Sequence, residues 1–194
     1  LLRCGLDEQV LCKGHSVEVI LPKYDTLKFE NMKNLQVCFR ELWSYDGPYS
    51  FNNTIWSCEV EGIHVKLIEP HHPHYFFHRG QIYGCEDDLR RFLYFTRASL
   101  EYLYKSGNSP DALHIHDWPV AAAAVLVKDM YKDLGMDIPK VVLTLHNLEH
   151  QGKCNSQDFS LVGLKGEDYQ TPDKLQDPID PYTLNLLKGG IVFS

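Results

Sequence analysis

The sequence predicts an α/β fold in which a parallel sheet carries helices on both faces and a β-hairpin region is inserted. Three observations support this class. Two apolar segments, residues 112–115 and 141–145, flank an Ala-rich stretch without helix breakers, which is typical of a βαβ unit. A long amphipathic segment, residues 86–105, precedes them. A β-rich region with strong turn signals lies earlier, at residues 33–69.

The composition fits about one domain. The chain has 194 residues, of which 44% are hydrophobic and 12% aromatic, so it can bury a core. Its net charge of −7 and pI near 5.8, with no basic cluster beyond Arg90-Arg91, argue against nucleic acid as a partner. No segment approaches the roughly 20 apolar residues of a membrane span, so we expect no membrane partner either.

The six cysteines are scattered, and none forms a C-x-x-C pair. This spacing favours free thiols in a reducing compartment over a disulfide framework or a zinc ribbon. The cysteines are Cys4, Cys12, Cys38, Cys58, Cys85 and Cys154.

The first predicted elements are the end of a helix, Leu6 to Lys13, and a strand, Ser16 to Leu21, which Pro22 ends. An α/β domain normally begins with a strand that leads into its first helix, and here that strand is missing. At the other end, residues 191–194 predict the opening of a buried strand at which the chain stops. We therefore expect a domain truncated at both ends.

Antiparallel hairpins are predicted next. Val37 to Trp43, Ser50 to Val60 and Ile63 to Ile68 are β-rich. They are separated by two turn signals, Asp46-Gly47-Pro48 and Glu61-Gly62.

The loop from Glu69 to Gly80 holds four histidines within eight residues. Their spacing fits no familiar zinc pattern, and Pro73 restricts how the loop could wrap an ion, so we expect no metal here. In the helix that follows, a stripe of large apolar side chains predicts core contacts. The stripe consists of Leu89, Phe92, Leu93, Thr96, Leu100 and Leu103.

The C-terminal part is expected to be irregular from Gly152 through Pro181, as functional or mobile segments of this length are. Tyr182 to Lys188 predicts a short helix, with Gly189-Gly190 as its terminator.

Polar side chains follow both strands of the predicted βαβ unit. His116-Asp117 come after the first strand, and His146-Asn147 come after the second. Parallel strands end at the same edge of a sheet, where α/β proteins bind their ligands, so these four side chains should converge. Asp117 also precedes the helical stretch, Val120 to Tyr131, and is a good N-cap candidate.

Six motifs in register resemble one family, the plant starch synthases and related bacterial glycogen synthases. They resemble its N-terminal, acceptor-side domain over nearly the whole chain. The motifs are Gly14-His15 with residues 19–25, Arg90-Arg91-Phe92 with Arg97-Ala98, His114 to Trp118, His146 to Glu149, Gln151-Gly152, and Asn185 to Ile191.

The resemblance implies a two-domain glycosyltransferase of the GT-B type, in which two Rossmann-like domains face each other across a cleft. Residues 1–194 would form the first of them. It implies transfer of glucose from ADP-glucose to the 4-hydroxyl of an α-1,4-glucan, amylose or amylopectin, with retention of configuration. It implies no metal or dissociable cofactor, and a location in the plastid, whether chloroplast or amyloplast.

Carried over by position, the resemblance gives Asp117 and His146 as catalytic residues, with Asp117 on the acceptor side and His146 against the transferred glucose. The substrate-binding candidates are His116, Trp118, Asn147, Gln151 and Arg79. Without the resemblance, a purely structural role is an alternative for both residues. Asp117 would then cap its helix, and His146 would bond to a backbone carbonyl.

The chain also departs from the family. It lacks the Lys-x-Gly-Gly-Leu loop that receives the donor phosphates, because Gly5-Leu6 aligns with a later part of the helix, and it lacks the second domain. It would therefore use ADP-glucose only if the missing parts were supplied, and would be inactive alone. Pro119 and His150 replace a polar residue and a tyrosine that are usual in the family.

Two other functions fit the sequence. A non-catalytic glucan-binding or regulatory partner, associated with a complete starch synthase, would keep the acceptor motifs and lose the donor loop. A zinc hydrolase could use His114, His116 and His146, since alternation places the first two on the same face of a strand.

Overall fold

The structure, a computed structural model, describes residues 13–194. The predicted N-terminal helix end lies outside the described residues except for Lys13, as do Cys4 and Cys12. The described chain divides into two compact units. The first contains the residues up to Glu41 together with Asn52–Ile82, and the second contains Leu42–Phe51 and Tyr83–Ser194.

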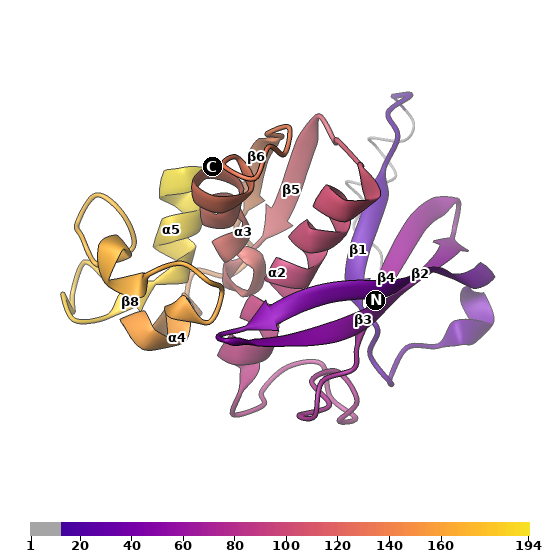
Figure 1. Cartoon of the computed structure of the whole chain (residues 1–194), viewed down its shortest axis with the longest axis horizontal. Helices are drawn as coiled ribbons and strands as arrows, with labels where there is room; N and C mark the ends of the chain where they lie inside the picture. The colour runs from indigo at the N-terminus through magenta and orange to yellow at the C-terminus, as the bar shows by residue number, and fades with distance from the viewer. Residues whose placement is uncertain (1–12) are drawn as a thin grey trace. The chain divides into compact units, whose positions relative to one another are not determined.

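The first unit is built on a four-stranded sheet of order β1-β4-β3-β2 (Figure 1). Strand β1 runs parallel to β4, and β3 runs antiparallel to β4, so Leu67 of β4 lies opposite Leu21 on one side and Trp56 on the other. The predicted hairpins are therefore confirmed. The strands are β1 (Glu18–Pro22), β2 (Lys33–Asp46), β3 (Tyr49–Val60) and β4 (Ile63–Pro70), with a 3-10 turn at Phe29–Asn31.

The core of this sheet is apolar on one face. Cys58, Val65 and Leu67 are almost fully buried, because alternate residues of β3 and β4 point to the same side. After β4 the histidine-rich loop packs by its rings. His72 is 3% exposed and stacks on Phe76 with ring centroids 4.0 Å apart, which gives this histidine a packing role.

The tip of the β2–β3 hairpin belongs to the second unit. Gly47 turns the chain with a φ of 59°, which favours glycine, and its N–H donates to the carbonyl of Leu161 at 2.9 Å. Next to it, the buried carboxylate of Asp46 pairs with Arg90 at 2.7 Å. These contacts fix the tip to the helical part of the second unit.

The second unit contains the predicted βαβ arrangement. Strand β5 (Ala112–His116) runs parallel to β6 (Lys140–Thr144), with Ile115 opposite Leu143 and His116 opposite Thr144. The helical stretch between them is a 3-10 turn, Trp118–Val120, then α3 (Ala122–Leu126), and then a π-helical turn, Val127–Tyr131. The alanines of α3 are buried, so small side chains let neighbouring elements approach closely.

Helix α2 (Asp88–Ser106) confirms the predicted long helix and ends at Gly107, which has a left-handed φ of 69°. It is buried on more than one side, because Arg97 and Glu101 lie inside the unit as a paired charge at 3.2 Å. Arg97 also donates to the hydroxyl of Tyr131, which is fully buried. The prediction that Leu89 belongs to the core was wrong, since Leu89 lies on the wall of a surface pocket.

The C-terminal region differs most from the sequence prediction. Instead of being irregular throughout, it contains a strand pair and three helical segments. The helix predicted for residues 182–188 begins later and runs through both glycines to Phe193, so the predicted glycine terminator and terminal strand were wrong. The elements are β7 (Lys153–Cys154), α4 (Ser156–Ser160), a 3-10 turn (Gly166–Tyr169), β8 (Leu184–Asn185) and α5 (Leu186–Phe193).

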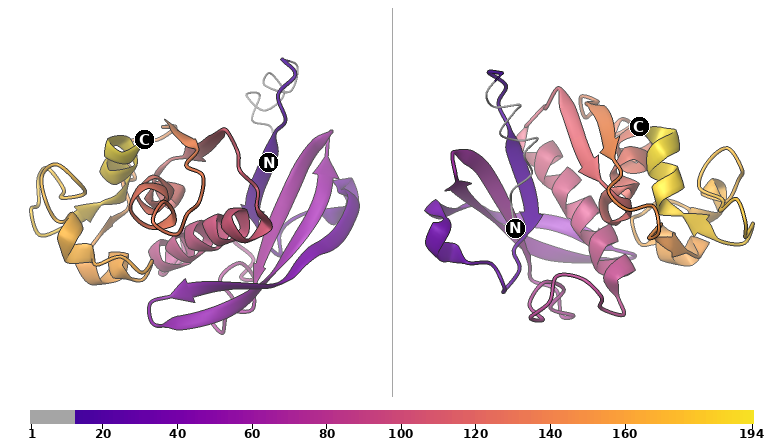
Figure 2. Two further views of the ribbon diagram at one scale, coloured as in Figure 1. Left: turned by 45° about the horizontal axis from the view of Figure 1, so that its top comes forward. Right: turned by 180° about the vertical axis from the view of Figure 1, so that it is seen from behind.

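Close packing explains why glycines occur inside α5. A Cβ atom at Gly189 would lie 2.7 Å from Cγ of Leu175, and one at Gly190 would lie 2.9 Å from Cβ of Ala121. Both distances are shorter than side chains allow, so the glycines let α5 lie beside α3, as Figures 1 and 2 show. The helix is capped by Asn185, whose side chain accepts from the N–H of Lys188 at 3.0 Å.

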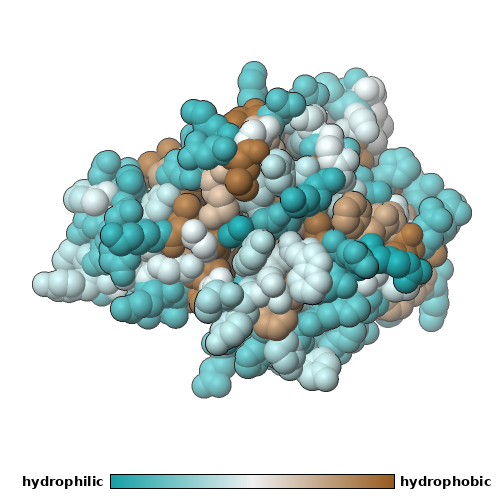
Figure 3. All heavy atoms as spheres, in the orientation of Figure 1, coloured by the Kyte–Doolittle hydropathy of each residue, from teal (hydrophilic) through white to brown (hydrophobic). Residues whose placement is uncertain are grey.

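The α/β class is thus confirmed, with parallel pairing in β1–β4 and in β5–β6. On the face drawn in Figure 3, hydrophobic side chains occur in small groups among hydrophilic ones. Within residues 13–194, no helix has the length and apolar character needed to cross a bilayer. Cys38, Cys58 and Cys154 are free thiols.

Candidate active site at the carboxyl ends of β5 and β6

The site begins where β5 and β6 end together. The N–H of Asp117 donates to the carbonyl of Thr144 at 3.0 Å, which continues the strand pairing by one residue. The chain leaving β5 and the chain leaving β6 are therefore held side by side. The predicted convergence of residues 116–117 with residues 146–147 is confirmed by the contacts described below.

Asp117 connects the two loops through its carboxylate. Its Oδ1 atom accepts from the backbone N–H of His146 at 2.7 Å and from that of Asn147 at 3.2 Å. The backbone of Asp117 has φ 55° and ψ −171°, a region that residues other than glycine rarely adopt and that costs about 1–3 kcal/mol. Strain of this kind is concentrated at functional sites.

The N-cap prediction for Asp117 was wrong. Its side chain makes no capping hydrogen bond to the 3-10 turn that follows it. An N-cap residue has an extended backbone with negative φ, and the positive φ of Asp117 directs its carboxylate to the loop after β6 instead. The carboxylate of Asp117 thus stabilises the loop after β6 and does not cap a helix.

Histidines line the same edge. Nδ1 of His116 lies 3.0 Å from Nε2 of His146, with the two rings nearly parallel and 5.3 Å apart. His114 lies two residues before His116 in β5, and the centroids of the two rings are 4.3 Å apart. Nε2 of His114 forms a hydrogen bond with Oγ1 of Thr144 at 2.7 Å. In the part of the chain that the structure describes, no three His, Cys, Asp or Glu side chains are grouped to hold a metal ion.

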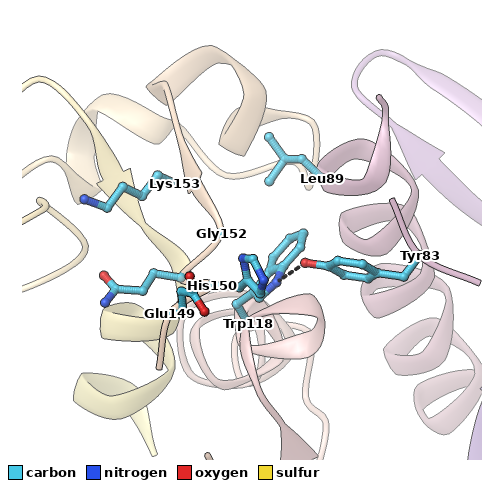
Figure 4. Close-up of a pocket in the computed structure, with 8 residues that line it drawn as sticks. Tyr83, Leu89, Trp118, Glu149, His150, Gly152 and Lys153 are labelled. Atoms are coloured by element: carbon cyan, nitrogen blue, oxygen red, sulfur yellow. Dashed lines mark hydrogen bonds between the residues drawn. The ribbon is translucent and has the colours of Figure 1, made fainter. Parts of the chain in front are cut away.

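A pocket of about 310 Å³ adjoins these residues (Figure 4). Tyr83 of this pocket is 47% exposed, while Trp118 is 7% exposed. The indole N–H of Trp118 donates to the hydroxyl oxygen of Tyr83 at 3.0 Å, drawn as a dashed line in Figure 4. The lining residues are Tyr83, Leu89, Trp118, Glu149, His150, Gln151, Gly152 and Lys153.

Gly152 lets the pocket wall approach the indole. Its φ of 61° lies in the left-handed region, and a Cβ atom there would be 2.4 Å from Cε3 of Trp118. Any other residue would therefore have to push the loop away from Trp118. The position of the loop after β6 depends on this contact and on Asp117.

A polar network supports the far side of the pocket. Asn185 donates to Oε1 of Gln151 at 2.6 Å and to the carboxylate of Asp177 at 2.9 Å, and Lys153 pairs with that carboxylate at 3.0 Å. Burial opposes ionisation of Asp177, but bonds from Asn185, Lys153 and two backbone N–H groups outweigh it and hold the pKa of this carboxyl well below its usual range.

The structure brings most of the predicted site residues together. Asp117, His116, His146 and Asn147 share the strand edge. Trp118 and Gln151 line the pocket, where the Gln151 side chain braces the loop by accepting from Asn185 and donating to the carbonyl of Leu148.

Arg79 belongs to the first unit, where its guanidinium donates to the carbonyl of His74, so its role in substrate binding stays a prediction. The sequence reasoning missed Tyr83, Glu149 and Lys153 as pocket residues. The signal in the sequence for Tyr83 is an aromatic residue in a loop bounded by two glycines, Gly80 and Gly84.

The sequence of this chain is similar to those of known glycogen and starch synthases. Residues 5–194 match the family model described as the starch synthase catalytic domain. The chain is 50% identical over 190 residues to a glycogen synthase of Protochlamydia amoebophila, covering 98% of this chain and 38% of that protein. It is 42% identical over 190 residues to the probable chloroplastic/amyloplastic starch synthase 4 of Arabidopsis thaliana, covering 98% of this chain and 18% of that protein.

A solved structure shares the fold. The catalytic domain of starch synthase IV from Arabidopsis thaliana, bound to ADP and acarbose, matches with a TM-score of 0.96 and 42% identity over 98% of this chain and 39% of that chain. The chain thus spans about two fifths or less of the relatives compared here, which include bacterial glycogen synthases as well as a plant enzyme. The chain belongs to the starch synthase catalytic-domain family of glycosyltransferases, which includes both glycogen and starch synthases.

Proposed function

We propose that this chain forms the acceptor-side half of an enzyme that transfers glucose from ADP-glucose to the non-reducing end of an α-1,4-glucan with retention of configuration. The observation that carries the proposal is the hydrogen bond from the His146 N–H to the Asp117 carboxylate, which places both proposed catalytic residues at one edge of the β5–β6 pair. The Arabidopsis relative, whose structure holds ADP and acarbose, supports the donor and the sugar chemistry.

The chemistry suits a carboxylate and an imidazole. Glycosyl transfer develops positive charge on the sugar ring, and fixed dipoles and hydrogen bonds stabilise that charge best when they are oriented beforehand. The strained backbone of Asp117 and its two bonds to the next loop provide such a fixed arrangement. In this proposal His146 contacts the transferred glucose, and Asp117 lies on the acceptor side.

The pocket is the proposed acceptor site. A glucose ring has apolar faces edged by hydroxyl groups, and Tyr83 presents an aromatic face beside the polar side chains of Glu149, His150 and Lys153. Its volume lies at the lower end of the range for small-ligand sites. The proposal requires no metal or dissociable cofactor.

The more specific assignment to a plant starch synthase, and with it a plastid location, stays a prediction. Its support is the Arabidopsis relative, whose name places it in chloroplasts and amyloplasts. The bacterial glycogen synthases among the relatives favour the broader assignment to α-glucan synthesis.

A second candidate is a non-catalytic glucan-binding or regulatory partner that associates with a complete starch synthase. The observation that favours it is that residues of this chain alone, Tyr83 and Trp118 among them, line the proposed acceptor pocket. Such a partner would bind glucan and leave ADP-glucose unused.

Two assays on the same preparation separate the candidates. Co-sedimentation with amylopectin measures acceptor binding, and incorporation of labelled glucose from ADP-glucose measures transfer. We expect the 194-residue chain to sediment with amylopectin without transferring glucose, and a longer protein that joins this chain to a donor-binding domain to do both.

Incorporation that is abolished by Asp117→Asn in the longer protein supports the transferase. Glucan binding by the longer protein without incorporation, together with co-purification of a separate synthase, supports the partner instead. Absence of glucan binding by either form rejects both proposals.

A further inference from the structure

The histidine row at the ends of β5 and β6 has an internal order that the proposed function does not use. His114 is anchored to Thr144, the ring of His116 packs against that of His114, and Nδ1 of His116 bonds to Nε2 of His146. All of these residues lie on two paired strands and the residues that directly follow. The paired strands therefore restrain the position of the last ring, that of His146, through these contacts.

A hydrogen bond between two imidazoles constrains both of them. A neutral imidazole has one N–H and one bare nitrogen, so one ring of the pair donates and the other accepts. The contact between His116 and His146 thus couples their tautomers and fixes the plane of the His146 ring. With Nε2 in use, Nδ1 is the ring nitrogen of His146 that a ligand can reach, and no residue in the range 13–194 bonds to it.

The backbone of His146 is fixed separately. Its N–H donates to Asp117, so Asp117 holds the main chain of His146 while His116 holds the ring. Without the second contact, the exposed His146 side chain could turn about both of its side-chain bonds. Reaction rates fall steeply when a contacting group is displaced by about 1 Å.

We infer that His116 is a positioning residue that orients the His146 ring, rather than a substrate-binding residue in its own right. This inference rests on the proposed function, since it assumes that His146 contacts the sugar. It also makes a statement about the free protein that can be tested without any substrate.

The first test uses nitrogen-15 spectra of the imidazole rings in this chain, without glucan or ADP-glucose. We expect the Nε2 signal of His146 to shift between the wild type and His116→Leu, because leucine removes the polar partner of that nitrogen. His116→Asn should move this signal back towards its wild-type position, because an asparagine amide places a polar group where Nδ1 of histidine lies. His146 signals that do not change in His116→Leu would overturn the inference.

The second test measures glucosyl transfer in the longer protein. We expect His116→Leu to lower kcat about 10²-fold with little change in KM for the glucan, and His116→Asn to recover most of the loss. His116→Gln, which places its amide near Nε2, should stay as slow as His116→Leu. This comparison of Asn with Gln holds even if the leucine variant folds poorly.

A raised KM with unchanged kcat, or equal rescue by Gln and Asn, would overturn the positioning role. His64→Leu serves as the matched control, because His64 is an exposed histidine of β4 in the other unit. If the wild-type protein transfers no glucose, the proposed function fails. The ring spectra then show independently whether the His116–His146 coupling exists.

Discussion

The carboxylate of Asp117 accepts a hydrogen bond from the backbone N–H of His146 at 2.7 Å, across a sequence separation of 29 residues. The bond joins the loop after β5 to the loop after β6. Asp117 holds this position with a φ of 55°, so the surrounding structure compensates for an unfavourable backbone conformation. The junction is therefore a rigid feature around which the pocket and the histidine row are arranged.

Asp117→Asn and Asp117→Ala should separate the charge of this residue from its structural role. Asparagine keeps an oxygen that can accept from His146 and Asn147, so we expect a small change in thermal stability but at least a 10²-fold loss of glucosyl transfer in the longer protein. Alanine leaves both N–H groups without this acceptor, and we expect it to cost about 2 kcal/mol in addition. Calorimetry and glucose incorporation measure the two effects.

Asp133→Ala is the control for the removal of an exposed acidic side chain from the same unit. It should leave both stability and transfer near the wild-type values. If Asp117→Asn transfers glucose at the wild-type rate, the charge of Asp117 has no role in the reaction.

Gly152→Ala should damage the pocket through a steric contact. A Cβ atom at this position would lie 2.4 Å from the Trp118 ring, and the left-handed φ adds a further penalty. We expect a loss of about 2–4 kcal/mol in the free energy of unfolding and at least tenfold weaker binding to amylopectin. Denaturant unfolding and co-sedimentation test this.

The matched control is Gly135→Ala. Gly135 has a φ of 86° but open space around its Cβ position, so this change costs only the backbone penalty of about 1–2 kcal/mol. The difference between the two variants measures the contact with Trp118. Equal losses of stability would mean that this contact is unimportant.

Asp177→Asn should make the protein less stable at neutral pH and change its response to acid. The pKa of Asp177 is held below its usual value, so its stabilising contribution is complete above about pH 5 and is lost as pH falls towards the folded-state pKa. Because the Lys153 side chain is 46% exposed and screened by water, loss of its ion pair with Asp177 should cost about 1 kcal/mol at pH 7.

Melting curves recorded between pH 7 and pH 2 test this prediction. The difference in melting temperature between wild type and Asp177→Asn should be largest at neutral pH and should shrink on acidification. A difference that stays constant across this range would show that Asp177 contributes by packing and not through its charge.

Tyr83→Phe should weaken glucan binding while keeping the aromatic face. The change removes the hydroxyl that accepts from the buried Trp118 N–H, which costs about 1–3 kcal/mol of stability. It also removes a polar group from the lining of the pocket. We expect affinity for amylopectin to fall about tenfold, which corresponds to about 1.4 kcal/mol. Co-sedimentation at several glucan concentrations gives the comparison.

Tyr182→Phe is the matched control, because Tyr182 is 83% exposed and lies outside the pocket residues. Its affinity for amylopectin should equal that of the wild type. Equal affinity of the Tyr83→Phe variant would place the glucan elsewhere on the chain.

The amino-acid pattern was sufficient to predict the α/β class, the hairpins, helix α2 and the meeting of two loops at one strand edge. Hydrophobic periodicity and turn residues act over a few neighbouring positions, and parallel strands necessarily end together, so these features can be inferred locally. The same reasoning placed His116, Asp117, His146 and Asn147 at the site.

The roles of the key residues depend on contacts between distant segments, which the amino-acid pattern does not reveal. Asp117 was expected to cap a helix, but its positive φ turns the carboxylate to a loop 29 residues away. Gly189 and Gly190 were expected to end a helix, but they lie inside α5 because Leu175 and Ala121 leave no room for a Cβ atom. Local propensity gives way in both places because a contact between distant segments outweighs a local preference of about 1 kcal/mol.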